Sequence, residues 1–299
     1  MPNFKPNSGQ DAGRPQHVRL TLTSGVPVTT ADVTSATSIF VSPYQGNVVT
    51  TYDLGLAWVP HSFSQVAIAL GTLSADVNYD VFGWYTNGVV GAFLGPSWAS
   101  ATARGTGAST TELTLQDGLY VNAVAISSTV AKAGLYLGTV RTTTTTTTED
   151  SLAKRFLWNM YHRKLRPMRV LESTDSWNYT TATWRQANAS TANQLAFVLG
   201  LEEEVVTAQC YAPSTNASAG RYTTIGLDVT NAKTVETLSW SVTSGVFNSS
   251  WANYKGFPGL GYHFLAWLEY SNTGGTSTWY GDAGEPTRTQ GGIHGEVTC

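Results

Sequence analysis

The sequence predicts a mostly β fold: two antiparallel β-sandwich domains, jelly-roll-like, with one short connecting helix. Only 12% of the 299 residues are charged, against about 25% in an ordinary soluble protein. Threonine and aromatic residues, which suit a pleated and half-buried surface, take their place. Short alternating segments are separated by turn residues, which is typical of sandwiches. The length suits two domains of about 120–150 residues each.

Residues 1–17 contain three prolines and one large apolar residue, Phe4. Such a segment buries too little apolar surface to fold by itself. We interpret it as an N-terminal anchoring arm, with Phe4 as the anchoring side chain, that orders when it docks on another protein. A frayed terminus without a role is the alternative.

The first sandwich domain is predicted over residues 18–141. Its opening segment, HVRLTLTSG, alternates apolar and polar residues, as half-buried strands do. Two dipeptides, Asn87-Gly88 and Asp117-Gly118, supply the positive φ angles that tight hairpin turns need. The apolar residues of this alternation are Val18, Leu20 and Leu22 in the opening segment, and Val66, Ile68 and Leu70 in a later segment.

Residues 142–164 form the predicted join. Seven threonines, Thr142–Thr148, precede an acidic pair that complements a helix N-terminus. Apolar residues then recur at helical spacing, at Leu152, Phe156 and Met160. This pattern predicts a helix of about 14 residues that ends before Pro167. The β-branched threonines favour an extended strand, so we expect a packed join.

The second sandwich domain is predicted over residues 165–299. Two segments, NQLAFVLGLEEEVV and TTIGLDVTN, again alternate apolar and polar residues. The stretch from Tyr262 to Asp282 carries aromatic residues on both sides of Asn272-Thr273-Gly274-Gly275. It predicts a long hairpin.

Charge and cysteine content narrow the function classes. A net charge of −3 argues against a nucleic-acid partner, whose phosphates require cations. No apolar run reaches the length of a membrane span, and the first residues lack the apolar core of a secretory signal. Cys210 and Cys299 are expected as thiols, and a disulfide between them is the alternative.

No catalytic motif, metal-ligand spacing or cofactor loop is found. We therefore expect no enzyme activity, no cofactor and no metal. Carboxylate pairs such as Glu172 with Asp175 are better explained as solvated loop residues. A metal loop through Asp282, Glu285 and His294 lacks the regular oxygen spacing of a calcium site.

Two residue sets are candidates for binding. A basic run is interpreted as interface charges that pair with nearby carboxylates, with a nucleic-acid patch as the alternative; it contains Arg155, Arg163, Arg166 and Arg169. Aromatic residues beside amides and hydroxyls suit glycan or receptor binding, and equally a core or subunit interface. These are Trp177, Tyr179, Trp184, Trp251, Tyr254 and Trp279.

The segment from Tyr136 to Gly200 resembles one that recurs in virion structural proteins of tailed bacteriophages and related prophages, among them tail-fibre, head-fibre and spike-like proteins. The stretches at 26–53 and 254–282 resemble the same family. The resemblance implies β-rich modules displayed on the particle, commonly as trimers, without a catalytic signature. No collagen-like or coiled-coil shaft is present, which favours a compact spike over a long fibre.

From this resemblance we expect a virion protein, assembled in the host cytoplasm, that forms a homotrimer. Its arm would dock on a capsid or tail protein, and its outer part would bind host cell-surface glycan or protein as a receptor-binding component. Capsid decoration, as a head-fibre or cement protein without a receptor, is the alternative. A glycan-degrading tailspike is the third.

Overall fold

The computed structural model describes residues 14–53, 57–126, 129–216, 220–234, 239–241 and 246–299. In these ranges the only helical element is η1, a 3-10 turn at Ala187–Ala189. No helix formed by these residues has the length and apolar character needed to cross a membrane. The predicted mostly β, antiparallel, sandwich-like fold is confirmed. Phe4 lies outside the described residues.

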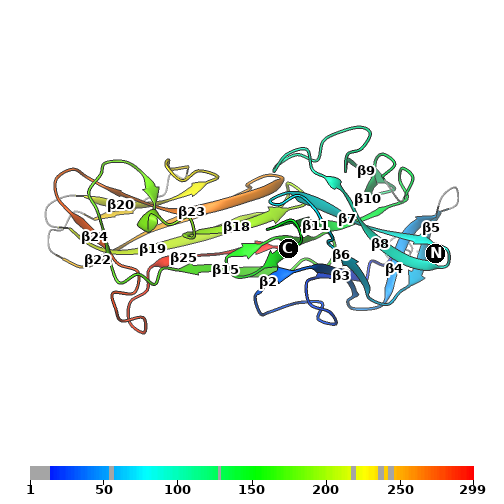
Figure 1. Ribbon diagram of the computed structural model, residues 1–299, viewed down its shortest axis with the longest axis horizontal. Helices are drawn as coiled ribbons and strands as arrows, with labels where there is room; N and C mark the ends of the chain where they lie inside the picture. The colour runs from blue at the N-terminus through cyan, green and yellow to red at the C-terminus, as the bar shows by residue number, and fades with distance from the viewer. Residues whose placement is uncertain (1–13, 54–56, 127–128, 217–219, 235–238, 242–245) are drawn as a thin grey trace, which may run out of the picture.

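The N-terminal half is built from strands that form several small sheets (Figure 1). The strands are β1 (Val18–Thr21), β2 (Val33–Ala36), β3 (Ser38–Pro43), β4 (Val48–Asp53), β5 (Ala57–Ser62), β6 (Val66–Ala69), β7 (Asn78–Thr86), β8 (Val89–Ser97), β9 (Leu113–Gln116), β10 (Leu119–Asn122) and β11 (Leu135–Arg141). One sheet has the order β1-β3-β6, another has the order β8-β7-β11-β10-β9, and β4 pairs with β5.

The two predicted tight turns are present in this half. Asn87 and Gly88 have φ angles of 51° and 84° between β7 and β8. Asp117 and Gly118 have φ angles of 50° and 89° between β9 and β10. Positive φ at both turn positions matches the twist of the flanking strands, so both hairpin predictions are confirmed.

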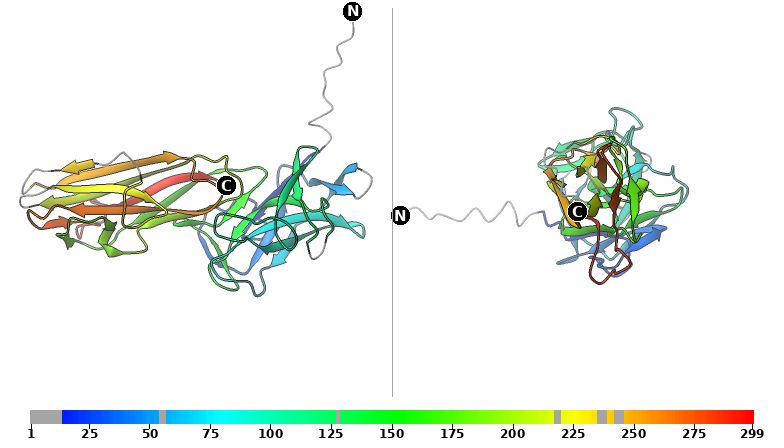
Figure 2. Two further views of the ribbon diagram at one scale, coloured as in Figure 1. Left: turned by 90° about the horizontal axis from the view of Figure 1, so that it is seen from above. Right: turned by 90° about the vertical axis from the view of Figure 1, so that its left-hand side faces the viewer.

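The C-terminal half continues the chain with strands whose lengths range from 2 to 11 residues. They are β12 (Thr148–Asp150), β13 (Lys154–Arg155), β14 (Leu157–Asn159), β15 (Leu165–Leu171), β16 (Trp177–Tyr179), β17 (Arg185–Gln186), β18 (Gln194–Leu199), β19 (Val206–Asn216), β20 (Arg221–Leu227), β21 (Ser239–Ser241), β22 (Asn248–Gly256), β23 (Gly261–Ser271), β24 (Ser277–Trp279) and β25 (Gly292–Thr298). Figure 2 shows these strands as two layers of a sandwich, with the N-terminal half following end to end.

One layer of this sandwich has the order β15-β25-β19-β24-β16, with β22 on the free side of β19. The other has the order β2-β12-β13-β18-β23-β20-β21, with β17 paired to β23. Buried side chains from both layers, such as Cys210 and Trp267, share one core. The predicted hairpin from Tyr262 to Asp282 is wrong, because β23 and β24 lie in different layers.

The predicted helix after the threonine run is also wrong. Leu157 and Trp158 are adjacent, and both are buried. A strand that is packed on both faces buries adjacent residues. A helix with a single apolar stripe does not require this. β12 pairs with β2, β13 with β18, and β14 with β11. Long-range pairing therefore overrides the helical spacing of Leu152, Phe156 and Met160.

The threonine run turns back on itself instead of extending. Thr142 and Thr148 form an isolated bridge and are both fully buried. Between them, the amide of Thr143 donates to the carbonyl of Thr147 at 2.8 Å. The expected extended strand is wrong for this stretch, whereas both of its ends are packed.

A buried ion pair lies where the two halves meet. Arg104 Nε donates to Asp80 Oδ2 at 2.6 Å, and Arg104 Nη2 donates to the carbonyl of Gly200 at 2.8 Å. Thr111 and Thr139 also donate hydroxyl hydrogen bonds to Asp80. Burial opposes the charge of Arg104, but Asp80 and Tyr136 outweigh it and hold the Arg104 pKa above its usual value. The pair ties the N-terminal half to Gly200, the residue that follows β18.

A second buried cluster joins the halves through Asp150. Its two oxygens contact Arg155 Nη1 at 2.8 Å and Arg166 Nη2 at 3.2 Å. Arg166 Nη2 also donates to the carbonyl of Thr29, at 2.7 Å, in the N-terminal half. Arg19 donates to the carbonyls of His162 and Cys299. We call these two clusters the seam.

We expect Asp80→Ala to lower the free energy of unfolding by about 3–5 kcal/mol, because it leaves the Arg104 guanidinium buried without its carboxylate. Chemical denaturation followed by circular dichroism measures the change. Glu285→Ala is the control, since the Glu285–Arg288 pair is exposed and its loss should cost at most about 0.5 kcal/mol. Equal effects of the two substitutions would contradict the assigned role of Asp80.

The shared sheet and the seam also predict that the halves unfold together. Trp98 reports on the N-terminal half and Trp267 on the C-terminal half, and both are buried. We expect each of the proteins Trp98→Phe and Trp267→Phe to unfold in one transition, with the same midpoint by fluorescence as by circular dichroism. Two separate transitions would show that the halves are independent.

Candidate ligand-binding surfaces

The outward face of four strands, β15, β25, β19 and β22, carries mostly polar side chains. Alternation along each strand sends one set of residues into the core; Met168, Cys210 and Ala252 belong to that set. The other set points away from the core. We call its central part the polar sheet face; it consists of Arg169, Thr207, Gln209, Tyr211, Trp251, Asn253, Lys255, His294 and Glu296. The exposed apolar residues of β15, Leu165, Pro167 and Leu171, border this face.

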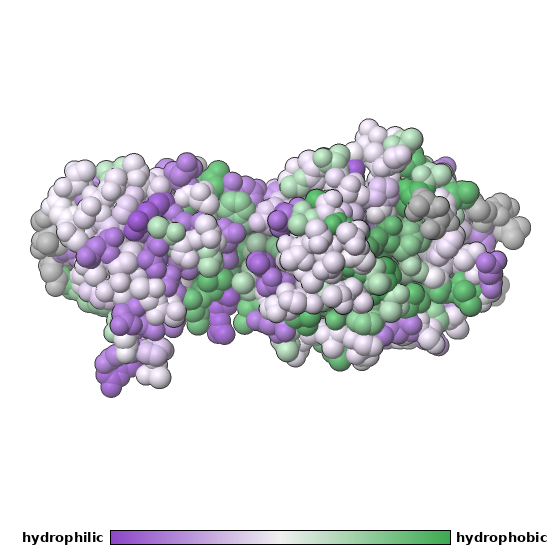
Figure 3. Space-filling view, viewed as in Figure 1, coloured by the Kyte–Doolittle hydropathy of each residue, from purple (hydrophilic) through white to green (hydrophobic). Residues whose placement is uncertain are grey.

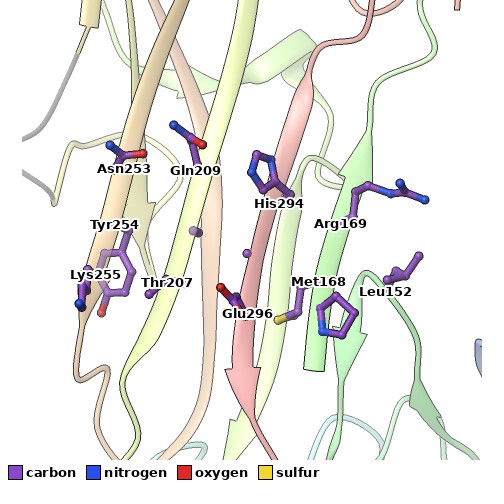
Figure 4. Close-up of a pocket in the computed structure, with 13 residues that line it drawn as sticks. Leu152, Met168, Arg169, Thr207, Gln209, Asn253, Tyr254, Lys255, His294 and Glu296 are labelled. Atoms are coloured by element: carbon purple, nitrogen blue, oxygen red, sulfur yellow. The ribbon is translucent and has the colours of Figure 1, made fainter. Parts of the chain in front are cut away.

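The strand register arranges these residues in rows. Gln209 lies between Asn253 and His294, and His294 lies beside Arg169. Figure 4 shows these four side chains next to one another across the strands. Because neighbouring strands are about 4.8 Å apart, the row spans about 14 Å. It offers amide, imidazole and guanidinium groups in sequence.

The rows on either side differ in chemistry. On one side, Thr207 lies between Lys255 and Glu296. On the other side, Tyr211 lies beside Trp251, and these rings are 41% and 46% exposed. The face thus combines a charged row, a hydrogen-bonding row and an aromatic row.

Tyr211 is held in place by its neighbours. Its ring stacks on His294, with centroids 5.5 Å apart and an interplanar angle of 12°. Its hydroxyl donates to Gln209 Oε1 at 3.1 Å. A ring with fixed orientation loses little conformational entropy when a ligand packs against it.

A groove of about 850 Å³ lies on this face, with Leu152 beside β15 at its border. Within the described parts of the chain, Arg169, Lys255 and Glu296 form no ion pair with one another or with other residues. Their hydrogen-bonding capacity therefore remains available to a ligand. A groove of this size, with a few polar groups and rings, is large enough for a small oligosaccharide.

Among the sequence candidates, Trp251 lies on the polar sheet face. Tyr254 is on the same strand but points into the core, and Trp279 is fully buried. Tyr179 is buried too, and its hydroxyl donates to Thr183. These three aromatic side chains stabilise the core, and the sequence alone does not separate them from Trp251.

The other two candidates lie near the opposite layer. The indole of Trp177 donates to Glu269 Oε2 at 2.7 Å and packs edge-on against Trp267. Trp184 is partly exposed, and its ring is 5.2 Å from that of Tyr270. Trp177 and Trp184 are close in sequence and lie in the same region of the fold, but their environments differ.

The basic candidates have different surroundings. Arg155 and Arg166 belong to the seam, as described above. Arg163 contacts Glu203 at 2.6 Å, and Glu204 as well. Arg169 lies on the polar sheet face. Three of the four thus contact carboxylates, and the fourth borders the groove.

Sequence reasoning missed most of the polar sheet face. Alternation in VTAQCYAPSTN and NSSWANYKG identifies outward residues, such as Gln209 and Asn253, once both segments are assigned as strands. Nothing local indicates that β15 and β25 complete the same face. The sequence indicates His294 only as a candidate metal ligand. In the structure its ring stacks on that of Tyr211.

Among the described residues, no three or more His, Cys, Asp or Glu side chains are grouped as metal ligands would be. Cys210 and Cys299 are buried and are not joined by a disulfide. Burial raises the pKa of each thiol to about 12, so both sulfurs are neutral packing groups at neutral pH.

Figure 3 shows the distribution of hydropathy on one face of the molecule. Hydrophobic side chains gather over the N-terminal half of the face in view, whereas the C-terminal half is mainly neutral to hydrophilic. The groove is therefore on the more polar of the two halves seen there.

Comparisons with known proteins add little. No family model matches the chain, and no curated protein matches it. The insecticidal delta-endotoxin Cry8Ea1 from Bacillus thuringiensis is similar at a TM-score of 0.27 and 5% identity, with 95% of this chain and 52% of the toxin chain covered. The structure of infectious bursal disease virus, Gx strain, is similar at a TM-score of 0.27 and 11% identity, with 95% of this chain and 70% of the viral chain covered. The chain spans about half the length of the toxin, and likenesses this weak carry no argument.

The burial of Glu269 predicts that stability depends on pH. Burial raises the Glu269 pKa from 4.5 to about 7, although Arg185 and Trp177 oppose the shift. The folded protein thus binds this proton more tightly than the unfolded chain does. The stabilising contribution is complete below the unfolded-state pKa and is lost as the pH rises through about 7.

We therefore expect Glu269→Gln to reduce the loss of stability between about pH 5 and 8. Urea denaturation at several pH values measures the free energy of unfolding for the parent and the variant. Glu285→Gln is the control, because Glu285 is exposed. If the parent and Glu269→Gln proteins have parallel pH profiles, the assignment is wrong.

Proposed function

We propose that this protein is a component of the surface of a bacteriophage particle and attaches the particle to glycan on the host cell. The polar sheet face is the observation that carries the proposal. It places exposed rings, amides and unpaired charges on one rigid surface. Pyranose rings present C–H groups that pack on aromatic rings, and hydroxyls that amides and charged side chains bind.

The rest of the fold supports this role. The two halves share a sheet and the seam, so a force applied at one end is transmitted without an interposed flexible linker. The chain enters the fold in the N-terminal half, where Arg14 contacts the carbonyl of Asp117. An arm that docks on another virion protein would therefore leave the polar sheet face at the other half accessible.

Attachment is favoured over decoration of the capsid by a specific feature. A cement protein requires complementary contacts with its neighbours, and apolar side chains dominate the centre of such interfaces. The centre of the polar sheet face instead carries Gln209 and His294, beside a groove. Amides and imidazole suit hydroxyl-bearing ligands better than an apolar protein surface.

The proposal predicts that Trp251→Ala and Arg169→Ala each weaken binding to purified host surface polysaccharide by about 5–30-fold, which corresponds to about 1–2 kcal/mol. Trp251 loses its packing surface and Arg169 its hydrogen-bond donors. Biolayer interferometry with immobilised polysaccharide measures the affinity, and circular dichroism verifies folding.

Arg288→Ala is the matched control, because Arg288 is exposed and contacts only Glu285 among the described residues. It removes the same charge outside the groove and should leave the affinity unchanged. Parent-like binding by both groove variants would contradict the site. Absence of parent binding, together with many copies on the head in a particle reconstruction, would favour decoration.

A further inference from the structure

A second hollow lies on the opposite layer of the C-terminal sandwich. Tyr222 on β20 and Tyr270 on β23 face each other across the strands in register. Trp184, in the segment that follows β16, covers them from one side. Lys233 and Asn272 complete the lining of a hollow of about 300 Å³. We call it the aromatic pocket.

The three rings are arranged as walls. The rings of Tyr222 and Tyr270 have centroids 5.5 Å apart and cross at 84°. Trp184 and Tyr270 have centroids 5.2 Å apart and cross at 49°. Because neither pair stacks flat, the rings surround the hollow without filling it. All three are partly exposed.

The support of the pocket is rigid. Arg185, next to Trp184, donates to Glu269 at 2.7 Å, and its strand pairs with β23. Trp177 contacts the same carboxylate. On the other side, the amide of Leu227 donates to Thr234 Oγ1 at 2.5 Å, which fixes the chain next to Lys233.

The described residues of the pocket carry a positive charge. Among them no acidic side chain lines the hollow, and Glu269, next to Tyr270, is fully buried with its oxygens on Arg185 and Trp177. Lys233 is exposed and makes no ion pair within the described ranges. An aromatic cage for a cation would not include an ammonium group in its own wall, because like charges repel.

We propose that the aromatic pocket is a second saccharide site, and that it binds one sugar residue carrying an anionic group. The rings contact the apolar face of the sugar. Lys233 binds the carboxylate or sulfate, and Asn272 binds a hydroxyl. The small volume limits the site to a single residue, whereas the groove of the polar sheet face is large enough for several.

This site is independent of the proposed function, because it lies on a different layer and shares no residue with the polar sheet face. If both sites bind parts of one polymer, each increases the effective concentration of ligand at the other. Binding to a long acidic polysaccharide would then be tighter than the affinity of either site alone.

The test uses the full chain and small probes: glucuronic acid, galacturonic acid, N-acetylneuraminic acid and glucose 6-sulfate, with glucose as the neutral probe. Saturation-transfer NMR and titration calorimetry measure binding. We expect at least one anionic probe to bind at least tenfold more tightly than glucose. We also expect its binding to weaken with added salt.

Trp184→Ala and Lys233→Ala should each weaken this binding at least tenfold, and Lys233→Arg should restore most of it. Lys233 is exposed, so its replacement leaves the fold intact even if Trp184→Ala does not. Arg288→Ala is the control, because Arg288 is exposed and lines neither site; it should bind the probes as the parent does.

Three results would overturn the proposal: no anionic probe binds, glucose binds equally well, or Lys233→Ala behaves as the parent. Loss of binding in Trp251→Ala but not in Lys233→Ala would assign the anionic sugar to the polar sheet face instead. The second site would stand if only Trp184 and Lys233 variants lost binding, even with no polysaccharide bound by the polar sheet face.

Discussion

The fold depends on charges that are satisfied only when its two halves are in contact. Asp80 is fully buried, and its partner Arg104 also donates to the carbonyl of Gly200 across the boundary. Asp150 holds Arg166, which reaches Thr29 in the other half. A buried ion without its partner costs several kcal/mol, so separating the halves is strongly unfavourable. The seam therefore makes a single rod of two groups of strands that could otherwise move as tethered units.

The sequence predicts features whose cause is local. Asn87-Gly88 adopts the predicted turn because its φ angles are determined by the dipeptide itself and by the strands next to it. The helix prediction failed because the spacing of Leu152, Phe156 and Met160 is a weak local signal. Strands β11, β2 and β18, which lie elsewhere in the sequence, pair with the same segment. Tertiary pairing of this kind overrides helix propensity.

The candidate surfaces illustrate the same limit. Trp177, Tyr179 and Trp184 are close in sequence, but one binds a buried carboxylate, one is in the core, and only Trp184 borders a hollow. The sequence alone does not distinguish the roles of these three rings. Their roles differ because of the strand geometry and because Glu269 is a partner of Trp177. The polar sheet face is distributed over four strands whose adjacency no local pattern encodes. Composition therefore predicts that such a protein has exposed rings, but not which rings.

Stiffness and binding are connected in this architecture. Both proposed sites are open to solvent, and a ligand in either one loses hydrogen bonds to water nearly as strong as those it gains. A single site of this kind therefore binds weakly, and useful attachment requires several sites to engage together. Simultaneous binding is efficient only if the distances between sites are fixed, because motion between them dilutes the effective concentration. The core shared by the two layers of the C-terminal sandwich fixes the distance between the two proposed sites, and the seam fixes that sandwich relative to the N-terminal half.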